Sequence, residues 1–173
     1  MRLAFAAVLL AAAAAWAAPP LPAAVVADLP GLKLVGEGTL RFIGIHVYDG
    51  SLWIPGDTYA PDGPFALQLQ YAMSVKGAVL ASKSVEEWKK QGLDDEAKFK
   101  QWEAEMTRVF PDIKSGDRLI GVNLPGKGAA FYSADRSLGM IADPEFAHAF
   151  FGIWLSEKTS EPKLRAQMLK LAK

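Results

Sequence analysis

The sequence predicts an α+β domain in which helices cover one face of an antiparallel sheet. Strand signals and helix signals occur in separate runs rather than in alternation: strands, two helices, strands, two helices. One strand segment also alternates apolar and polar residues with a period of two, as antiparallel strands do. The chain has 173 residues, 51% of them hydrophobic, which suffices for one core and one domain.

Residues 1–17 have the pattern of a signal peptide. Met1-Arg2 gives a basic start, an apolar run follows, and Ala15 and Ala17 occupy the small-residue cleavage positions. The apolar run is shorter than the roughly 20 residues of a membrane span, and it ends at Pro19-Pro20. We therefore expect cleavage after about Ala17, export to the periplasm or outside the cell, and no stable membrane anchor afterwards.

The first strands follow a proline-rich segment. Residues 18–31 are predicted to form an extended lead-in, because proline removes backbone donors, and the domain is expected to span residues 32–173. Residues 32–53 are rich in apolar and β-branched side chains. With a turn signal at Asp49-Gly50, they indicate a hairpin or a bent strand pair.

The next strand lies between Phe65 and Val75. Its alternation places Phe65, Leu67, Leu69 and Tyr71 on one side and Gln68 and Gln70 on the other. This period of two predicts a half-buried strand with one solvated face.

A helical pattern begins at Ser84. Ser84 and Glu87 have the spacing of a capping box, and Gly92 suits the left-handed residue that ends a helix. A second helix is expected from about Asp94 to Phe110, before Pro111. Its apolar residues recur at helical spacing: Phe99, Trp102, Met106 and Val109.

Three short strands and two helices complete the domain. The strands are expected at residues 118–124, 129–133 and 138–142. Asp143-Pro144-Glu145 then opens a helix, with an N-cap and a proline in the first turn, that runs to Leu155 and is nearly all apolar. Such a helix is buried on most sides. A last helix begins at Ser160-Glu161-Pro162.

The composition excludes several classes of function. Formal charge is zero for the chain and −1 once Arg2 is removed (18 basic and 19 acidic residues), so nothing provides the positive field that nucleic-acid binding needs. No lysine-rich face accompanies an apolar one, so binding to anionic lipid is not predicted either. The absence of cysteine excludes disulfides, thiol catalysis and thiolate metal sites.

The candidate motifs for nucleotide and metal binding lack the residues or the secondary structure that such sites require. The segment from Gly121 to Gly128 resembles a phosphate loop but lacks its hydroxyl residue, and a strand follows it instead of a helix. Gly36-x-Gly38 likewise continues as a strand, which favours a bulge or close backbone packing. His46 and His148 have no local partner that would complete a metal pair, and we predict a core histidine at position 148. No cofactor and no metal are expected.

Arg41 is the candidate that remains. In an extended strand Arg41 shares a face with Ile43 and Ile45, while Tyr48 lies on the other face. The guanidinium could hold a carboxylate or phenolate whose apolar body lies along the isoleucines. Alternatively, Arg41 extends over the sheet and pairs with a surface acid, and Tyr48 is a core ring with a satisfied hydroxyl.

Four segments resemble the bacterial branch of the chalcone isomerase-like proteins: LVGEGTLRFIGIHVYDGSLW, GPFALQLQY, FPDIKSGDRLIGVNLPGKGAAFY and FAHAFFGIWLSEKTSEPKLR. The resemblance covers about residues 32–171. It implies an open-faced β-sandwich, in which a layer of helices covers one face of a large antiparallel sheet, and a ligand cleft between sheet and helices.

The resemblance does not extend to catalysis. Plant chalcone isomerases use an arginine, a strand threonine, a helix tyrosine with an asparagine, and a late hydroxyl residue. Here Ile43 falls at the threonine position, the helix at Ser84 has no tyrosine, and Ala149 to Phe151 occupy the late position. Fatty-acid-binding relatives keep an arginine and a tyrosine, and Arg41 and Tyr48 are similar to that pair in type. A β-bulge near Gly44 would be needed to bring them together.

We therefore expect an exported, non-catalytic protein that binds a small apolar or fatty-acid-like molecule. The expected binding residues are Arg41, Ile43, Ile45, Tyr48, Tyr71, Phe150 and Trp154. One alternative is an isomerase or intramolecular lyase in which Arg41 stabilises an oxyanion. The other is a structural or interaction protein whose packed core leaves no cleft.

Overall fold

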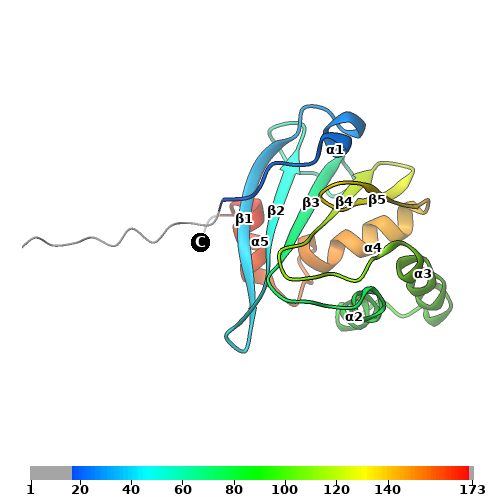
Figure 1. Ribbon diagram of the computed structural model, residues 1–173. Helices are drawn as coiled ribbons and strands as arrows, with labels where there is room; N and C mark the ends of the chain where they lie inside the picture. The colour runs from blue at the N-terminus through cyan, green and yellow to red at the C-terminus, as the bar shows by residue number, and fades with distance from the viewer. Residues whose placement is uncertain (1–16, 172–173) are drawn as a thin grey trace, which may run out of the picture.

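The computed structural model describes residues 17–171, so the predicted signal peptide lies almost wholly outside the described residues. Within them, six strands pair antiparallel in chain order to form one open sheet: β1 (Lys33–Phe42), β2 (Ile45–Ile54), β3 (Phe65–Tyr71), β4 (Arg118–Leu124), β5 (Gly128–Tyr132) and β6 (Ser137–Ile141). The sheet confirms the α+β class that the order of strand and helix signals predicts, and the large antiparallel sheet that the family resemblance implies. Figure 1 shows the strands and the helices packed beside them.

Four helices lie on one face of this sheet. They are α2 (Gly77–Lys90) and α3 (Glu96–Val109), inserted between β3 and β4, and α4 (Pro144–Leu155) and α5 (Pro162–Leu169), which follow β6. The central one, α4, packs on β4 and β5, and α5 packs on β1 and β2. The Asp143 side chain accepts hydrogen bonds from the amides of Glu145 and Phe146, which confirms the predicted N-cap.

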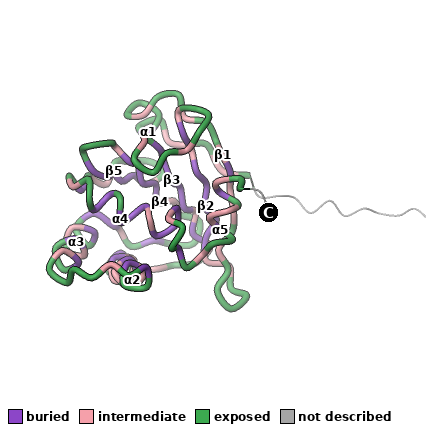
Figure 2. Tube along the Cα trace, turned by 180° about the vertical axis from the view of Figure 1, so that it is seen from behind, coloured by how far each residue is buried: buried purple, intermediate pink, exposed green. Residues whose placement is uncertain are grey.

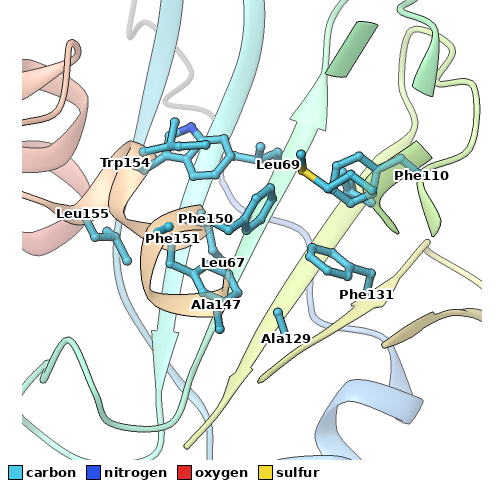
Figure 3. Packing of buried hydrophobic residues seen from close by; sticks show 14 of the residues in the cluster. Leu67, Leu69, Phe110, Ala129, Phe131, Ala147, Phe150, Phe151, Trp154 and Leu155 are labelled. Carbon is cyan, nitrogen blue, oxygen red and sulfur yellow. The ribbon is translucent and has the colours of Figure 1, made fainter. Parts of the chain in front are cut away.

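Aromatic side chains fill the layer between α4 and the sheet. Phe150, Phe151 and Trp154 point from α4 towards Leu67 and Leu69 of β3, as Figure 3 shows. Burial of each such ring contributes about 1.5–3 kcal/mol. The prediction that this apolar helix is buried on most sides is confirmed, and the helix is thereby fixed on the sheet.

The opposite face of the sheet is also covered, by the segment that precedes β1. The prediction that residues 18–31 are extended is wrong in part, because Ala23–Asp28 form the helix α1. Val25 of this helix packs fully buried among Ala66, Ile120 and Val122. Gln68 Nε2 donates a hydrogen bond of 2.9 Å to the carbonyl of Pro19. The expectation of a half-buried β3 is therefore wrong, because the lead-in shields the face that carries Gln68.

The turn of the first hairpin lies at Ile43-Gly44 and not at Asp49-Gly50. Phe42 pairs with Ile45, and the two residues between them have φ of 48° and 76°. Positive φ at both central residues is the pattern of a type I′ turn, whose twist matches that of the flanking strands. Asp49 and Gly50 sit inside β2, paired with β1 and β3.

Close approach of α5 explains the two glycines at the start of this hairpin. A Cβ at Gly36 would lie 2.5 Å from the carbonyl oxygen of Gln167, and one at Gly38 would lie 2.4 Å from its side-chain Oε1. The register of β1 also shifts between Leu34 and Gly36. Both features predicted for Gly36-x-Gly38, a bulge and close packing, are present.

The start of α2 differs from the prediction. This helix begins at Gly77, so Ser84 lies in its middle and donates to the carbonyl of Leu80 instead of capping an end. The backbone N–H of Gly77 donates a hydrogen bond of 3.0 Å to the Asp112 carboxylate. This contact is remote in sequence, so the local pattern could not indicate the true start. The helix ends at Lys90, and Gly92, two residues beyond, has the positive φ expected of a helix terminator.

Candidate functional site

A cavity of about 530 Å³ lies between the helix-covered face of the sheet and helices α2 and α4. Its volume falls in the range of about 300–1,000 Å³ found for small-molecule sites. Most of its wall is apolar and comes from β1, β2, β3, α2, α4 and the residue that follows α3: Leu40, Phe42, Val47, Leu69, Val79, Leu80, Phe110, Phe150, Ile153 and Trp154. The space between sheet and helices is thus open, contrary to the packed-core alternative.

A β-bulge at Val47 shapes the wall formed by β2. Leu40 pairs with Tyr48 and Arg41 pairs with His46, which leaves Val47 as an extra residue on its strand. Both Val47 and Tyr48 line the cavity, although strict alternation would have put them on opposite faces. The bulge therefore adds a side chain to the site.

Two tyrosines provide hydroxyl groups in this apolar wall. The rings of Tyr48 and Tyr71, on neighbouring strands, have centroids 5.5 Å apart. Tyr48 Oη accepts a hydrogen bond of 2.8 Å from Trp154 Nε1, which leaves its own proton free to donate. Among the described residues the Tyr71 hydroxyl has no hydrogen-bond partner. Burial raises the pKa of both phenols, so both remain neutral donors.

The end of the cavity near α2 and α5 is polar and carries charges of both signs, from Lys83, Glu86, Glu87, Lys90 and Glu161. Glu87 accepts hydrogen bonds from Lys90 Nζ (2.6 Å) and Ser160 Oγ (2.5 Å). Burial acts to raise the pKa of Glu87, but these two hydrogen bonds outweigh it and hold the pKa below its ordinary value. For Glu161, burial and then the charge of Glu87 raise the pKa. Both carboxylates also act to raise the pKa of Tyr48, after burial.

Four of the seven residues predicted from the sequence meet in the cavity. Tyr48, Tyr71, Phe150 and Trp154 all contribute to its wall. Arg41, Ile43 and Ile45 do not, because the turn at Ile43-Gly44 places them at the tip of the first hairpin. There Arg41 is exposed and Nη1 donates to the carbonyl of Gly44 at 3.4 Å. The Val47 bulge therefore does not bring Arg41 to Tyr48.

Several wall residues escaped the sequence analysis. Val79 and Leu80 lie on α2, before the capping box that was expected to begin that helix. Leu69 could have been predicted as a wall residue, because it lies on the same face of β3 as Tyr71 in the alternating pattern. Ile43 does not lie in a strand, so the position that the resemblance gave to a catalytic threonine lies outside the cavity.

His148 is exposed rather than a core residue. Its ring lies on the solvent side of α4, with Nδ1 3.3 Å from the Asp62 carboxylate. His46 is in β2, with Nε2 3.0 Å from Asp49. Within residues 17–171 no three potential ligands among His, Asp and Glu come together as a metal site.

Sequence comparison identifies the family of this cavity-bearing fold. Residues 13–170 match the chalcone isomerase-like family. The chain belongs to that family. It is 30% identical over 136 residues to an uncharacterised protein of Haemophilus influenzae, and the match covers 78% of this chain. That alignment covers 66% of the relative, just under two thirds of its length.

The chalcone isomerase-like fold is also found in a solved plant structure. The crystal structure of a fatty-acid binding protein from Arabidopsis thaliana superposes with a TM-score of 0.62 at 13% identity, covering 81% of this chain and 87% of that one. At this identity the likeness shows the fold alone. The binding residues of this chalcone isomerase-like protein must therefore be argued from its own cavity.

Proposed function

We propose that this protein binds a small amphipathic molecule, with an apolar body of fatty-acid-like character, and carries out no chemistry on it. The observation that carries the proposal is the apolar cavity of about 530 Å³ between the sheet and α2 and α4. Burial of an acyl or fused-ring body there would gain about 25 cal/mol per Å² of apolar surface. The fatty-acid binding protein with the same fold supports this class of ligand.

The two tyrosines hold the polar end of the ligand. A carbonyl, ester or hydroxyl oxygen that enters the cavity can accept from Tyr71 and Tyr48, whose rings lie side by side. Each hydrogen bond contributes about 0.5–1.5 kcal/mol. Glu87 at this end is paired with Lys90, whereas Glu161 has no ion-pair partner among the described residues, so a neutral oxygen beside Glu161 binds better than a carboxylate at neutral pH.

Analysis of the purified protein tests the proposal. Native mass spectrometry followed by solvent extraction should recover an apolar molecule, and a fluorescent fatty-acid probe should be displaced by long-chain compounds. Tyr71→Phe should weaken the binding of an oxygen-bearing ligand about threefold to tenfold, through loss of one hydrogen bond. Tyr59→Phe is the matched control, because Tyr59 packs against Phe65 and does not line the cavity. An empty protein that ignores every probe contradicts the proposal.

Export is part of the same proposal. The three-part pattern of residues 1–17 supports cleavage and a periplasmic or secreted location. Cell fractionation and the intact mass of the purified protein test this part of the proposal. A protein that stays in the cytoplasm and still carries residues 1–17 contradicts it.

A second candidate function is an isomerase or intramolecular lyase. It rests on the same two phenols, since paired neutral donors can stabilise a developing oxyanion. Arg41, which the sequence suggested for this role, does not line the cavity. Turnover of chalcone or related enones that is lost in Tyr71→Phe and kept in Arg41→Gln would favour this candidate.

A further inference from the structure

The tip of the β1–β2 hairpin carries an apolar surface that the fold leaves uncovered. Phe42 is 65% exposed, Ile43 85% and Ile45 60%. Figure 1 shows the hairpin reaching beyond the neighbouring end of the sheet, and in Figure 2 its tip has the colour of exposed residues. Single exposed apolar residues are ordinary, but three within four consecutive positions form a patch.

Ile43 is unfavourable for the turn in which it lies. Its φ of 48° belongs to the left-handed region, which β-branched residues avoid and which asparagine and glycine accept. At the first central position of a type I′ turn, asparagine is the preferred residue. Folding therefore gains nothing from an exposed isoleucine at this position, and a functional role can account for it.

The patch continues into the rim of the cavity. Phe42 belongs to both, and two other wall residues, Met73 and Val79, are partly exposed. An apolar molecule that enters or leaves the cavity past these side chains remains in contact with the tip. This step rests on the proposed function, because it takes the cavity to be the ligand site.

Size and charge together indicate what covers the tip. An aromatic side chain covers only about 150–250 Å², so three side chains exposed to these fractions fall short of the ~800 Å² per partner of a standard protein interface. A lipid bilayer needs no such area, since a few apolar side chains can enter it. The composition does not predict binding to anionic lipid, but the structure isolates Arg41 to His46 at the hairpin tip, where there is one cationic side chain and no acid. This local charge suits anionic headgroups.

We propose that the tip formed by Arg41 to His46 inserts into an anionic lipid surface, so that the cavity mouth faces the source of its ligand. Phe42, Ile43 and Ile45 enter the acyl boundary, and Arg41 pairs with lipid phosphates at the level of the headgroups. The contact is peripheral and reversible.

Vesicle flotation tests this docking without any added ligand. The protein, in the form that cells produce and with its N-terminus set by intact mass, is mixed with phosphatidylcholine vesicles with and without phosphatidylglycerol. Ile43→Asn/Ile45→Thr removes two of the three apolar side chains of the tip while providing the Asn-Gly pair that the turn prefers, so the fold is preserved. We expect at least about tenfold weaker binding for this variant and about fivefold weaker binding for Arg41→Gln, with loss of the preference for phosphatidylglycerol.

Leu34→Thr provides the matched control. Leu34 is a partly exposed apolar residue at the far end of the same hairpin, and its replacement should leave flotation unchanged. Both hairpin variants should still bind a soluble fatty-acid probe, which separates failure of docking from failure of the cavity. Flotation of Ile43→Asn/Ile45→Thr at the wild-type level overturns the proposal. So does a concentration-dependent dimer that this variant abolishes, because the occupant would then be a second copy.

Discussion

Trp154 on α4 donates a hydrogen bond of 2.8 Å from Nε1 to the hydroxyl of Tyr48 on β2. This contact joins the helix layer to the sheet at the wall of the cavity. It also sets the chemistry of the site, because the Tyr48 hydroxyl oxygen accepts the Trp154 N–H and the hydroxyl keeps its own proton for a ligand.

Tyr48→Phe and Tyr71→Phe should differ in stability. The first leaves the Trp154 indole N–H without an acceptor, which costs about 1–3 kcal/mol of unfolding free energy. The second removes a hydroxyl that has no partner among the described residues, so the unfolding free energy of the unliganded protein should hold or rise slightly. Urea unfolding with tryptophan fluorescence measures both. Equal losses would mean that Tyr71 has a structural partner.

Val79→Trp should close the mouth of the cavity. Val79 lines the cavity and is partly exposed, so a larger ring can cover the opening without overpacking the core. We expect at least about tenfold weaker binding of a long-chain probe, from loss of apolar contact area, and an unchanged melting temperature. Met140→Trp, on an exposed position of β6 outside the cavity wall, controls for the added ring. Full probe binding by Val79→Trp would place the ligand elsewhere.

Glu161→Gln should stabilise the protein at neutral pH. Burial and the nearby Glu87 raise the pKa of Glu161 above its ordinary value of 4.5. Because the pKa of Glu161 is raised, the folded state holds the carboxyl proton more tightly than the unfolded state does. The protonated carboxyl therefore favours folding below pH 4.5, and this stabilisation is lost as the pH rises through the pKa of the folded state. At neutral pH the variant lacks this penalty.

The gain should be less than about 1 kcal/mol, because Glu161 is partly exposed and solvent screens it. Thermal unfolding at neutral pH and well below pH 4.5 measures it, with no difference expected at the lower pH. Glu157→Gln, at an exposed position, is the control. The same Glu161→Gln variant should bind a fatty acid more tightly at neutral pH, since one negative charge leaves the site. If Glu161→Gln is less stable than the wild type at neutral pH, the pKa of Glu161 is not raised by folding.

Gly36→Ala should loosen α5 from the sheet. The added Cβ would lie 2.5 Å and 2.6 Å from the backbone oxygens of Gln167 and Met168, which cannot rotate away. We expect a loss of about 1–3 kcal/mol in unfolding free energy, typical of overpacking. Gly56→Ala has open space around its Cβ and should be neutral. If Gly36→Ala is also neutral, α5 tolerates displacement.

The helix that carries the aromatic core shows how far local pattern extends. Asp143-Pro144-Glu145 predicts the start of α4 correctly, because capping and a first-turn proline are local physics. The start of α2 fails for the converse reason. Gly77 is held by Asp112, a residue that the chain brings close only after α3 has folded back.

The candidate site divides in the same way. Phe150, Trp154 and Tyr71 are predictable as site residues because the regular period of a helix or a strand fixes the face on which each lies. Tyr48 is predictable because it is a tyrosine, the residue type that fatty-acid-binding relatives use. An extended strand through position 44 would put Arg41, Ile43 and Ile45 together on one face of the sheet. The two-residue turn at Ile43-Gly44 breaks that assumption and moves all three to the hairpin tip.

Four properties follow from the amino-acid sequence without the structure: the fold class, the absence of thiol chemistry, the apolar helix α4 and the family resemblance. These depend on composition, period and end signals, which act over a few residues. The tertiary structure alone decided that a cavity remains, that two phenols face it beside two carboxylates, and that an apolar tip projects next to its mouth. The reason is that the burial of a residue and the charges around it depend on segments distant in the chain. The lead-in covers Gln68 in this way, and α5 packs against Gly36.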